Sequence, residues 1–126
     1  MEKKKTVLII EDEKNIRGSI VDVLRLNDFL TLEASNGQEG VDLALEKHPD
    51  LILLDLLMPV MDGMTAFKKI RDDSWGKDVP VIILTNVSAT EEKLVKGMIE
   101  FKPGYYLVKS DWKIHDVVDK IEKMLK

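Results

Sequence analysis

The sequence feature that most constrains the fold is a run of aliphatic residues that ends in one carboxylate. Residues 51–54 are Leu, Ile, Leu and Leu, and Asp55 follows them directly. Four consecutive aliphatic residues predict a strand buried on both faces, as in the centre of a parallel sheet. An unpaired carboxylate is costly in such surroundings, so we expect Asp55 to lie where the strand ends. Pro59 and the turn residues Asp62-Gly63 then prevent the strand from continuing.

Apolar runs alternate with stretches of helical periodicity along the whole chain. Strands are predicted at residues 7–10, 29–34, 51–54, 79–84 and 105–108. Each is followed by apolar residues at helical spacing, at 16–24, 41–48, 64–70, 94–101 and 114–125. Before the second helix, Ser35 with Gln38, or Asn36 with Glu39, has the spacing of a capping box. Five strands that alternate with five helices predict an α/β fold in which helices cover both faces of a parallel sheet.

Composition indicates one globular domain. The chain has 126 residues, 44% of them hydrophobic and 33% charged, with a formal net charge of −4. This charge argues against nucleic acid as the main ligand. The absence of cysteine excludes disulfides and thiolate metal sites and fits a cytoplasmic protein. The apolar run after the basic start is too short for a signal peptide, and no segment has the length of a membrane span.

Polar residues follow four of the five predicted strands. They are Glu11-Asp12, Asp55, Thr85 and Lys109. The carboxyl ends of parallel strands meet at one edge of the sheet, so we expect these side chains to lie together. Crowded carboxylates repel one another, and Mg²⁺, which prefers oxygen ligands, relieves that repulsion. A cation and a lysine beside a carboxylate nucleophile suit phosphoryl transfer, in which Thr85 offers its hydroxyl to the phosphoryl group.

Each of these residues also has an ordinary structural explanation. Asp55 and Thr85 can cap loops, Lys109 can be solvated, and Glu11-Asp12 can complement a helix N-terminus. Their joint placement at the strand ends of one α/β chain favours a functional site.

The motifs resemble the receiver domain of two-component response regulators, from about Lys5 to the C-terminus. The matching motifs are Val7-Leu8-Ile9-Ile10-Glu11-Asp12-Glu13, Ala34-Ser35-Asn36-Gly37, Asp50-Leu51-Ile52-Leu53-Leu54-Asp55, Met58-Pro59, Asp62-Gly63, Pro80-Val81-Ile82-Ile83-Leu84-Thr85 and Tyr106-Leu107-Val108-Lys109. The resemblance implies a flavodoxin-like (βα)5 three-layer sandwich with a parallel five-stranded sheet of order 2-1-3-4-5. We expect residues 1–126 to form a single, chemotaxis-regulator-like receiver domain with no output domain.

The resemblance also implies a role for each site residue. Asp55 accepts a phosphoryl group from a histidine kinase or a histidine phosphotransfer protein. Mg²⁺, or Mn²⁺ as a substitute, binds Asp12, Asp55 and the backbone carbonyl of Leu57, and Glu11 contributes through water. The residues that contact the phosphoryl oxygens are Thr85 and Lys109.

By the same resemblance, the chain is a switch rather than a turnover enzyme, although it promotes its own phosphorylation and dephosphorylation at Asp55. Thr85 moves toward the phosphorylated Asp55, and Tyr106 turns into the space that opens. This reshapes the surface of the fourth helix, the fifth strand and the fifth helix, which binds a downstream protein. No direct contact with nucleic acid and no membrane insertion are expected, and the chain is a monomer or a phosphorylation-dependent dimer.

The sequence departs from the family pattern at three positions. Ser110 follows Lys109 where the family usually has a proline with a cis bond. Asn86 follows Thr85 where a very small residue is usual. Glu11 replaces the commoner aspartate. The changes at 110 and 86 keep open the alternative of a receiver-like interaction scaffold that is not phosphorylated.

Two other classes of protein fit the sequence less well. A phosphatase with a haloacid-dehalogenase-type site needs a second aspartate where Leu57 stands. A flavin or dinucleotide binder needs a glycine-rich loop after the first strand, where this chain has Glu11-Asp12-Glu13.

Overall fold

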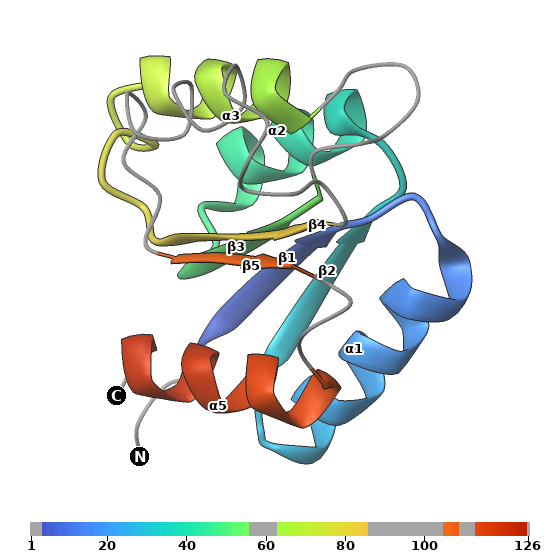
Figure 1. Cartoon of the computed structure of the whole chain (residues 1–126). Coiled ribbons are helices and arrows are strands. Elements are labelled where there is room, and N and C mark those ends of the chain that lie inside the picture. Colours follow the sequence, from blue (N-terminus) through green and yellow to red (C-terminus); the bar gives the residue numbers. More distant parts are fainter. Residues whose placement is uncertain (1–3, 56–62, 86–104, 109–112, 126) are drawn as a thin grey trace.

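The computed structural model describes residues 4–55, 63–85, 105–108 and 113–125 (Figure 1). Within these residues the elements, in chain order, are β1 (Thr6–Ile10), α1 (Lys14–Leu26), β2 (Leu30–Ala34), α2 (Gly37–Lys47), β3 (Leu51–Leu54), α3 (Gly63–Asp72), β4 (Val81–Thr85), β5 (Tyr105–Val108) and α5 (Ile114–Leu125). The predicted fourth helix, at 94–101, lies outside the described residues. None of the helices described here has the length and apolar character that crossing a membrane requires.

The strands form one parallel sheet of order β2-β1-β3-β4-β5. This is the order expected for the flavodoxin-like fold, so that prediction is confirmed. In the register of the sheet, Ile10 at the end of β1 is paired with both Ala34 of β2 and Leu54 of β3. Thr85 at the end of β4 is paired with Val108 of β5. The carboxyl ends of all five strands therefore face the same edge of the sheet.

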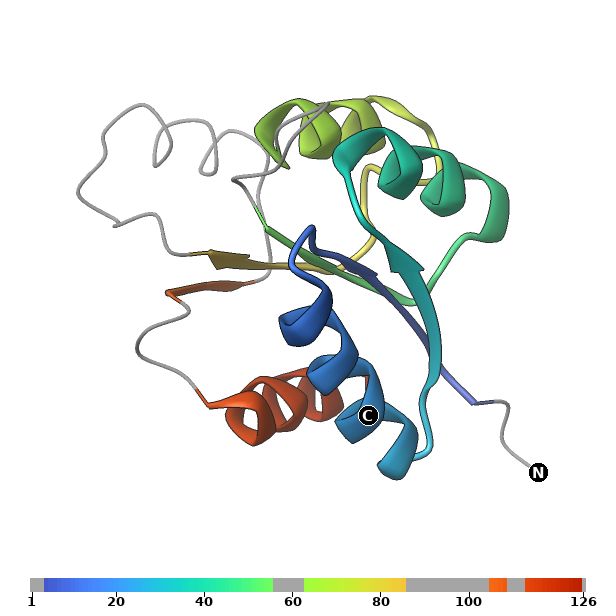
Figure 2. The same ribbon diagram turned by 90° about the vertical axis from the view of Figure 1, so that its right-hand side faces the viewer.

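Strand residues alternate between two buried faces, each covered by helices (Figures 1 and 2). Toward α2 and α3, one core cluster contains Ile10, Leu54, Ile83, Ala44 and Phe67. Toward α1 and α5, the other contains Ile9, Leu53, Ile82, Leu24 and Val118. Successive strand side chains point to opposite faces, so a central strand covered on both sides must be apolar throughout. The residues of β3 are at most 2% exposed, as the aliphatic run at 51–54 predicts.

Helix α2 starts from a side-chain cap and passes close to β1. The side-chain oxygen of Asn36 accepts a hydrogen bond of 2.9 Å from the backbone N–H of Glu39, so of the two predicted capping pairs the Asn36–Glu39 pair is the one that caps the helix. Gly40 lies against the end of β1, where an added Cβ would be 2.5 Å from Cδ1 of Ile10. A glycine at this position allows the helix to approach the strand that carries the acidic residues.

The inner face of α2 differs from the predicted one at two positions. Val41 and Ala44 are buried as expected, but Leu45 is 37% exposed and His48 is also exposed. The prediction that Leu45 and His48 face inward is wrong. At His48 the helix ends in a left-handed conformation (φ 49°, ψ 61°), which turns the side chain out of the helical register. The imidazole instead stacks on the Trp75 ring, with centroids 4.6 Å apart.

Candidate functional site

Three carboxylates meet at the carboxyl ends of the two central strands β1 and β3. Glu11 and Asp12 follow β1, and Asp55 follows β3. Each contributes one carboxylate oxygen to a group whose members all lie within 4.8 Å of one another. The structure thus brings together three of the residues that the sequence singled out.

Backbone hydrogen bonds fix the starting points of these side chains. The N–H of Asp55 donates to the carbonyl oxygen of Ile10, and the N–H of Glu11 donates to that of Ala34, both at 3.0 Å. Each bond extends a parallel ladder one residue beyond the strand. Glu11 and Asp55 therefore leave the sheet from adjacent strands at the same level, and their carboxylates converge.

The carboxylates differ in exposure. Glu11 is 3% exposed and Asp55 is 5% exposed, whereas Asp12 is exposed to solvent. Negative charges this close together repel one another most strongly where water is excluded. The three groups offer only hard oxygen donors, which is the donor chemistry of Mg²⁺ and Mn²⁺ sites, and the exposed Asp12 leaves a route from solvent. The residues present therefore fit a hard divalent cation.

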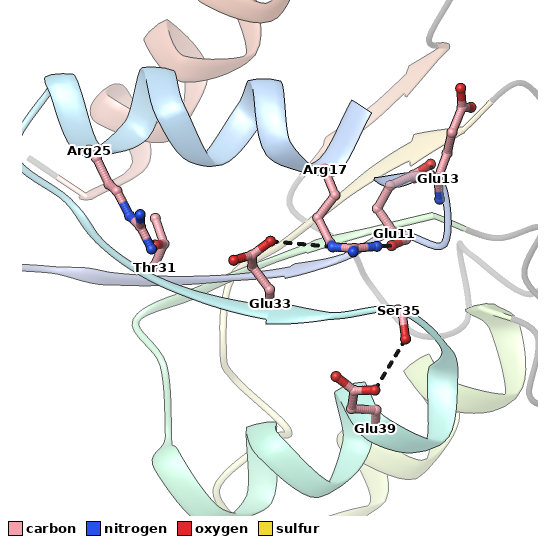
Figure 3. Close-up of polar contacts among 8 residues, drawn as sticks. All are labelled: Glu11, Glu13, Arg17, Arg25, Thr31, Glu33, Ser35 and Glu39. Atoms are coloured by element: carbon pink, nitrogen blue, oxygen red, sulfur yellow. Dashed lines mark hydrogen bonds and ion pairs between the residues drawn. The ribbon is translucent and has the colours of Figure 1, made fainter. Parts of the chain in front are cut away.

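The loop between β1 and α1 is held by polar contacts that the sequence analysis did not anticipate (Figure 3). A carboxylate oxygen of Glu11 lies 3.4 Å from the backbone nitrogen of Glu13, from which it accepts a hydrogen bond. Nη1 of Arg17 donates to the carbonyl oxygen of Glu11 at 2.8 Å, and its Nε donates to Glu33 of β2 at 3.3 Å. One feature of the sequence could have indicated these contacts. A cation in the first turn of a helix is repelled by the helix dipole, so Arg17 is expected there only with a nearby hydrogen-bond acceptor.

The remaining predicted site residues are described only in part. Thr85 ends β4, beside the end of β3, and Tyr106 lies in β5 opposite Ile83; these are backbone positions. The predicted site residues outside the described part of the chain are Leu57, which would supply a carbonyl ligand, and Lys109, which follows β5. The same holds for the two positions of unusual sequence, Asn86 and Ser110.

Comparison with curated proteins places these features in a family. Residues 7–122 match the response regulator receiver domain. The polar-differentiation response regulator DivK of Brucella ovis is 34% identical over 98 residues, which cover 76% of this chain and 80% of DivK. The nitrate/nitrite response regulator protein NarL of Escherichia coli K12 is 36% identical over 104 residues, which cover 81% of this chain and 47% of NarL. The matched part also spans only 41% of the probable transcriptional regulator ycf27 of Guillardia theta.

Solved structures with the same fold include receiver domains. The chemotaxis protein CheY4 of Vibrio cholerae superposes with a TM-score of 0.86 at 25% identity, over 96% of this chain and 98% of CheY4. The receiver domain of the sensor histidine kinase PA1611 of Pseudomonas aeruginosa, which has a magnesium ion coordinated in its active site cleft, superposes with a TM-score of 0.83 at 26% identity. That match covers 96% of this chain and 97% of the PA1611 domain. We conclude that this chain belongs to the response regulator receiver domain family of two-component systems.

Proposed function

We propose that this protein is a phosphorylation-activated switch in a two-component phosphorelay, with Asp55 as the phosphoryl acceptor. Receiver domains act as signalling switches and not as turnover enzymes. The observation that most supports the proposal is the cluster of Glu11, Asp12 and Asp55, whose carboxylate oxygens lie within 4.8 Å of one another at the ends of β1 and β3. Asp55 is the member of this cluster that follows the fully buried strand β3.

The chemistry assigned to Asp55 is nucleophilic. One carboxylate oxygen bonds to phosphorus, the bond from phosphorus to the imidazole nitrogen of the donor histidine breaks, and that nitrogen keeps the electron pair. Asp55 is only 5% exposed, so the donor must bring its phosphoryl group to the end of β3. A histidine kinase or a histidine phosphotransfer protein would present the group in this way.

The acidic cluster is the proposed cation site. Asp12, Asp55 and the backbone carbonyl of Leu57 would hold Mg²⁺ or Mn²⁺ directly, and Glu11 would contribute through water. When bound, the cation supplies positive charge that stabilises the phosphoryl oxygens. The all-oxygen donor set supports this assignment, and so does the similarity to the PA1611 receiver domain, whose active site cleft holds magnesium.

Two further residues are proposed to contact the phosphoryl group, and a third is proposed to change conformation when Asp55 is phosphorylated. Thr85 and Lys109 would bind the phosphoryl oxygens, and Tyr106 would turn as Thr85 moves toward Asp55. The backbone position of Thr85 at the end of β4, beside β3, supports its role. The resulting change would alter the surface of the fourth helix, β5 and α5, and so control binding of a downstream protein or formation of a dimer.

The test is phosphoryl uptake from acetyl phosphate with and without Mg²⁺, measured by intact mass. We expect a Mg²⁺-dependent gain of one phosphoryl group that is absent in Asp55→Ala and Asp55→Asn. The matched control is Asp50→Asn, which changes an aspartate just before the same strand, where Asp50 accepts a hydrogen bond from the N–H of Thr6. This control should still be phosphorylated. No uptake by the wild type would instead favour a scaffold that signals by binding alone. Asn86 and Ser110 would then be the first residues to replace with those usual in the family, a very small residue and a proline.

A further inference from the structure

Arg17 connects the acidic loop to the edge strand of the sheet. Its Nη1 donates a hydrogen bond of 2.8 Å to the carbonyl oxygen of Glu11. Its Nε lies 3.3 Å from a carboxylate oxygen of Glu33 on β2. The Arg17 side chain is 16% exposed, against 43% for Glu33. Figure 3 shows the Arg17 guanidinium group between Glu33 and Glu11. A guanidinium has separate donors in a fixed arrangement, so it can hold both acceptors at once.

The carbonyl that Arg17 binds belongs to the peptide unit between Glu11 and Asp12. The N–H of Glu11 already donates to Ala34 at the end of β2. Glu11 is therefore held on both sides, by the β2 backbone through its N–H and by Arg17 through its carbonyl. Holding this carbonyl oxygen restrains ψ of Glu11 and φ of Asp12, and so the path of the backbone that carries both side chains. The contact with Arg17 thus restrains the backbone that carries two of the three members of the acidic cluster.

The start of α1 also contacts this loop through the backbone N–H of Glu13, which donates a hydrogen bond of 3.4 Å to the Glu11 carboxylate. This bond holds the Glu11 side chain but not the carbonyl oxygen that Arg17 binds. Glu13 is the cap residue of α1, and its side chain makes no capping hydrogen bond. The first turn of α1, as the structure describes it, contains no acidic side chain that could interact with the helix N-terminus in place of a cap. The backbone N–H of Arg17 donates to the carbonyl oxygen of Glu13, so the residue that holds Glu11 is itself fixed in the first turn of the helix.

We propose that Arg17 is a positioning residue for the divalent cation, which it serves by orienting Glu11 and Asp12 without touching the cation. The inference rests on the proposed function, because it assumes that the acidic cluster binds Mg²⁺. Charge alone predicts the opposite effect, since a nearby positive charge weakens the attraction of the site for a cation. Neutralising Arg17 therefore separates the two explanations by the sign of the change in affinity.

The main variant is Arg17→Met, which removes the guanidinium and keeps an apolar stem. We expect the dissociation constant for Mg²⁺ to rise by about 10-fold, as is typical when a residue that orients metal ligands is removed. The dissociation constant is measured without any phosphoryl donor, from the electron paramagnetic resonance signal of free Mn²⁺ and its displacement by Mg²⁺. The reading thus does not depend on phosphorylation. An unchanged or lower dissociation constant would overturn the inference.

The matched control is Arg25→Met. Arg25 lies near the other end of the same helix, and its Nε donates a 3.1 Å hydrogen bond to the hydroxyl of Thr31 on the same strand β2. This variant loses the same charge and a hydrogen bond between α1 and β2, but away from the acidic cluster (Figure 3). Its affinity for Mg²⁺ should match the wild type. An equal loss of affinity in Arg25→Met and Arg17→Met would show that the effect is not specific to the loop and would overturn the proposal.

Arg17→Lys tests the inference without a change in charge. One ammonium nitrogen cannot reach two acceptors with the geometry of the guanidinium fork, so we expect a loss of roughly 3-fold in affinity. This variant decides the question if Arg17→Met does not fold, and a dissociation constant equal to that of the wild type would then overturn the proposal. If the wild type itself bound neither Mn²⁺ nor Mg²⁺, both this inference and the proposed function would fail. If the wild type bound the cations and the Arg17 variants bound them with the same dissociation constants, only this inference would fail and the proposed function would stand.

Discussion

The backbone N–H of Asp55 donates a hydrogen bond to the carbonyl oxygen of Ile10, with the two atoms 3.0 Å apart. Ile10 is the last residue of β1, and Asp55 is the first residue after β3. The bond therefore joins the two strand ends that carry the acidic cluster. The backbone of Asp55 cannot move away from Glu11 and Asp12 without breaking this extension of the sheet. Repulsion between the carboxylates thus acts against the folded state.

Asp55→Asn should stabilise the protein when divalent cations are absent. The amide has nearly the shape of the carboxylate but carries no charge, so one source of repulsion in the acidic cluster disappears. We expect the free energy of unfolding in the presence of a chelator to rise by about 1 kcal/mol. Urea unfolding followed by circular dichroism measures the change.

The control is Asp50→Asn, for which we expect the opposite sign. Asp50 accepts a 2.8 Å hydrogen bond from the N–H of Thr6, and an ionised acceptor binds such a donor more strongly than an amide oxygen does. Its loss should cost about 0.5–1 kcal/mol. A lower stability of Asp55→Asn under the same conditions would show that the acidic cluster is not strained by its charge.

Mg²⁺ should stabilise the wild-type protein against unfolding. A ligand that binds only the folded state at a free concentration of about 100 times its dissociation constant adds about 2.7 kcal/mol to the free energy of unfolding. Because Asp55 is one of the proposed ligands, the gain should be much smaller in Asp55→Asn, and the order of stability of the two proteins should reverse as Mg²⁺ is added. The measurement is the urea midpoint as a function of free Mg²⁺, with Na⁺ at equal ionic strength as the control. Equal gains in both proteins would place the cation elsewhere.

Much of the fold follows from the sequence because each central strand has a strong local signal. The aliphatic residues of β1 and β3 are buried on both faces, and this demands an unbroken apolar run that periodicity detects. The meeting of Glu11, Asp12 and Asp55 follows from the same argument, since it needs only that the strands are parallel and adjacent.

The contacts that depend on tertiary structure were not predictable in this way. Arg17 and Glu33 are 16 residues apart and meet only because β2 lies beside β1 in the sheet. His48 continues the apolar spacing of α2, yet the helix ends there in a left-handed conformation and the side chain stacks on Trp75. Spacing along a helix does not show where that helix stops.

Gly40→Ala should destabilise the protein although alanine favours helices. The new Cβ would lie 2.5 Å from Cδ1 and 2.8 Å from Cγ1 of Ile10, so the side chain at the end of β1 must shift. Overpacking costs about 1–3 kcal/mol and the helix propensity of alanine returns about 1 kcal/mol, which leaves a net loss near 1 kcal/mol. The matched control is Gly18→Ala in α1, where an added Cβ meets no atom within 4 Å.

For Gly18→Ala we expect a gain of up to about 1 kcal/mol from helix propensity alone. Thermal or urea unfolding of both variants gives the comparison. If Gly40→Ala were as stable as Gly18→Ala, the result would contradict the close contact between α2 and Ile10 at the end of β1.

Arg71→Met should loosen the connection between α3 and β4. Nη1 of Arg71 donates to the carbonyl oxygens of Gly76 at 2.7 Å and Val79 at 2.8 Å, and the guanidinium carbon lies 5.0 Å from the centre of the Phe67 ring. Burial lowers the pKa of Arg71 and the charge of Asp78 opposes this, but a guanidinium remains protonated at neutral pH. Its removal leaves two carbonyl groups without their charged donor, so we expect a loss of about 2 kcal/mol in the free energy of unfolding.

The control for Arg71→Met is Lys69→Met, because Lys69 is an exposed cation on the same helix. A surface change of this kind should stay within about 0.5 kcal/mol of the wild type. Because the acidic cluster lies at the opposite ends of the strands from the 73–80 connection, the Arg71 variant should also bind Mg²⁺ as the wild type does. A loss of Mg²⁺ affinity in Arg71→Met, or equal stabilities of the two variants in urea, would contradict a role confined to this connection.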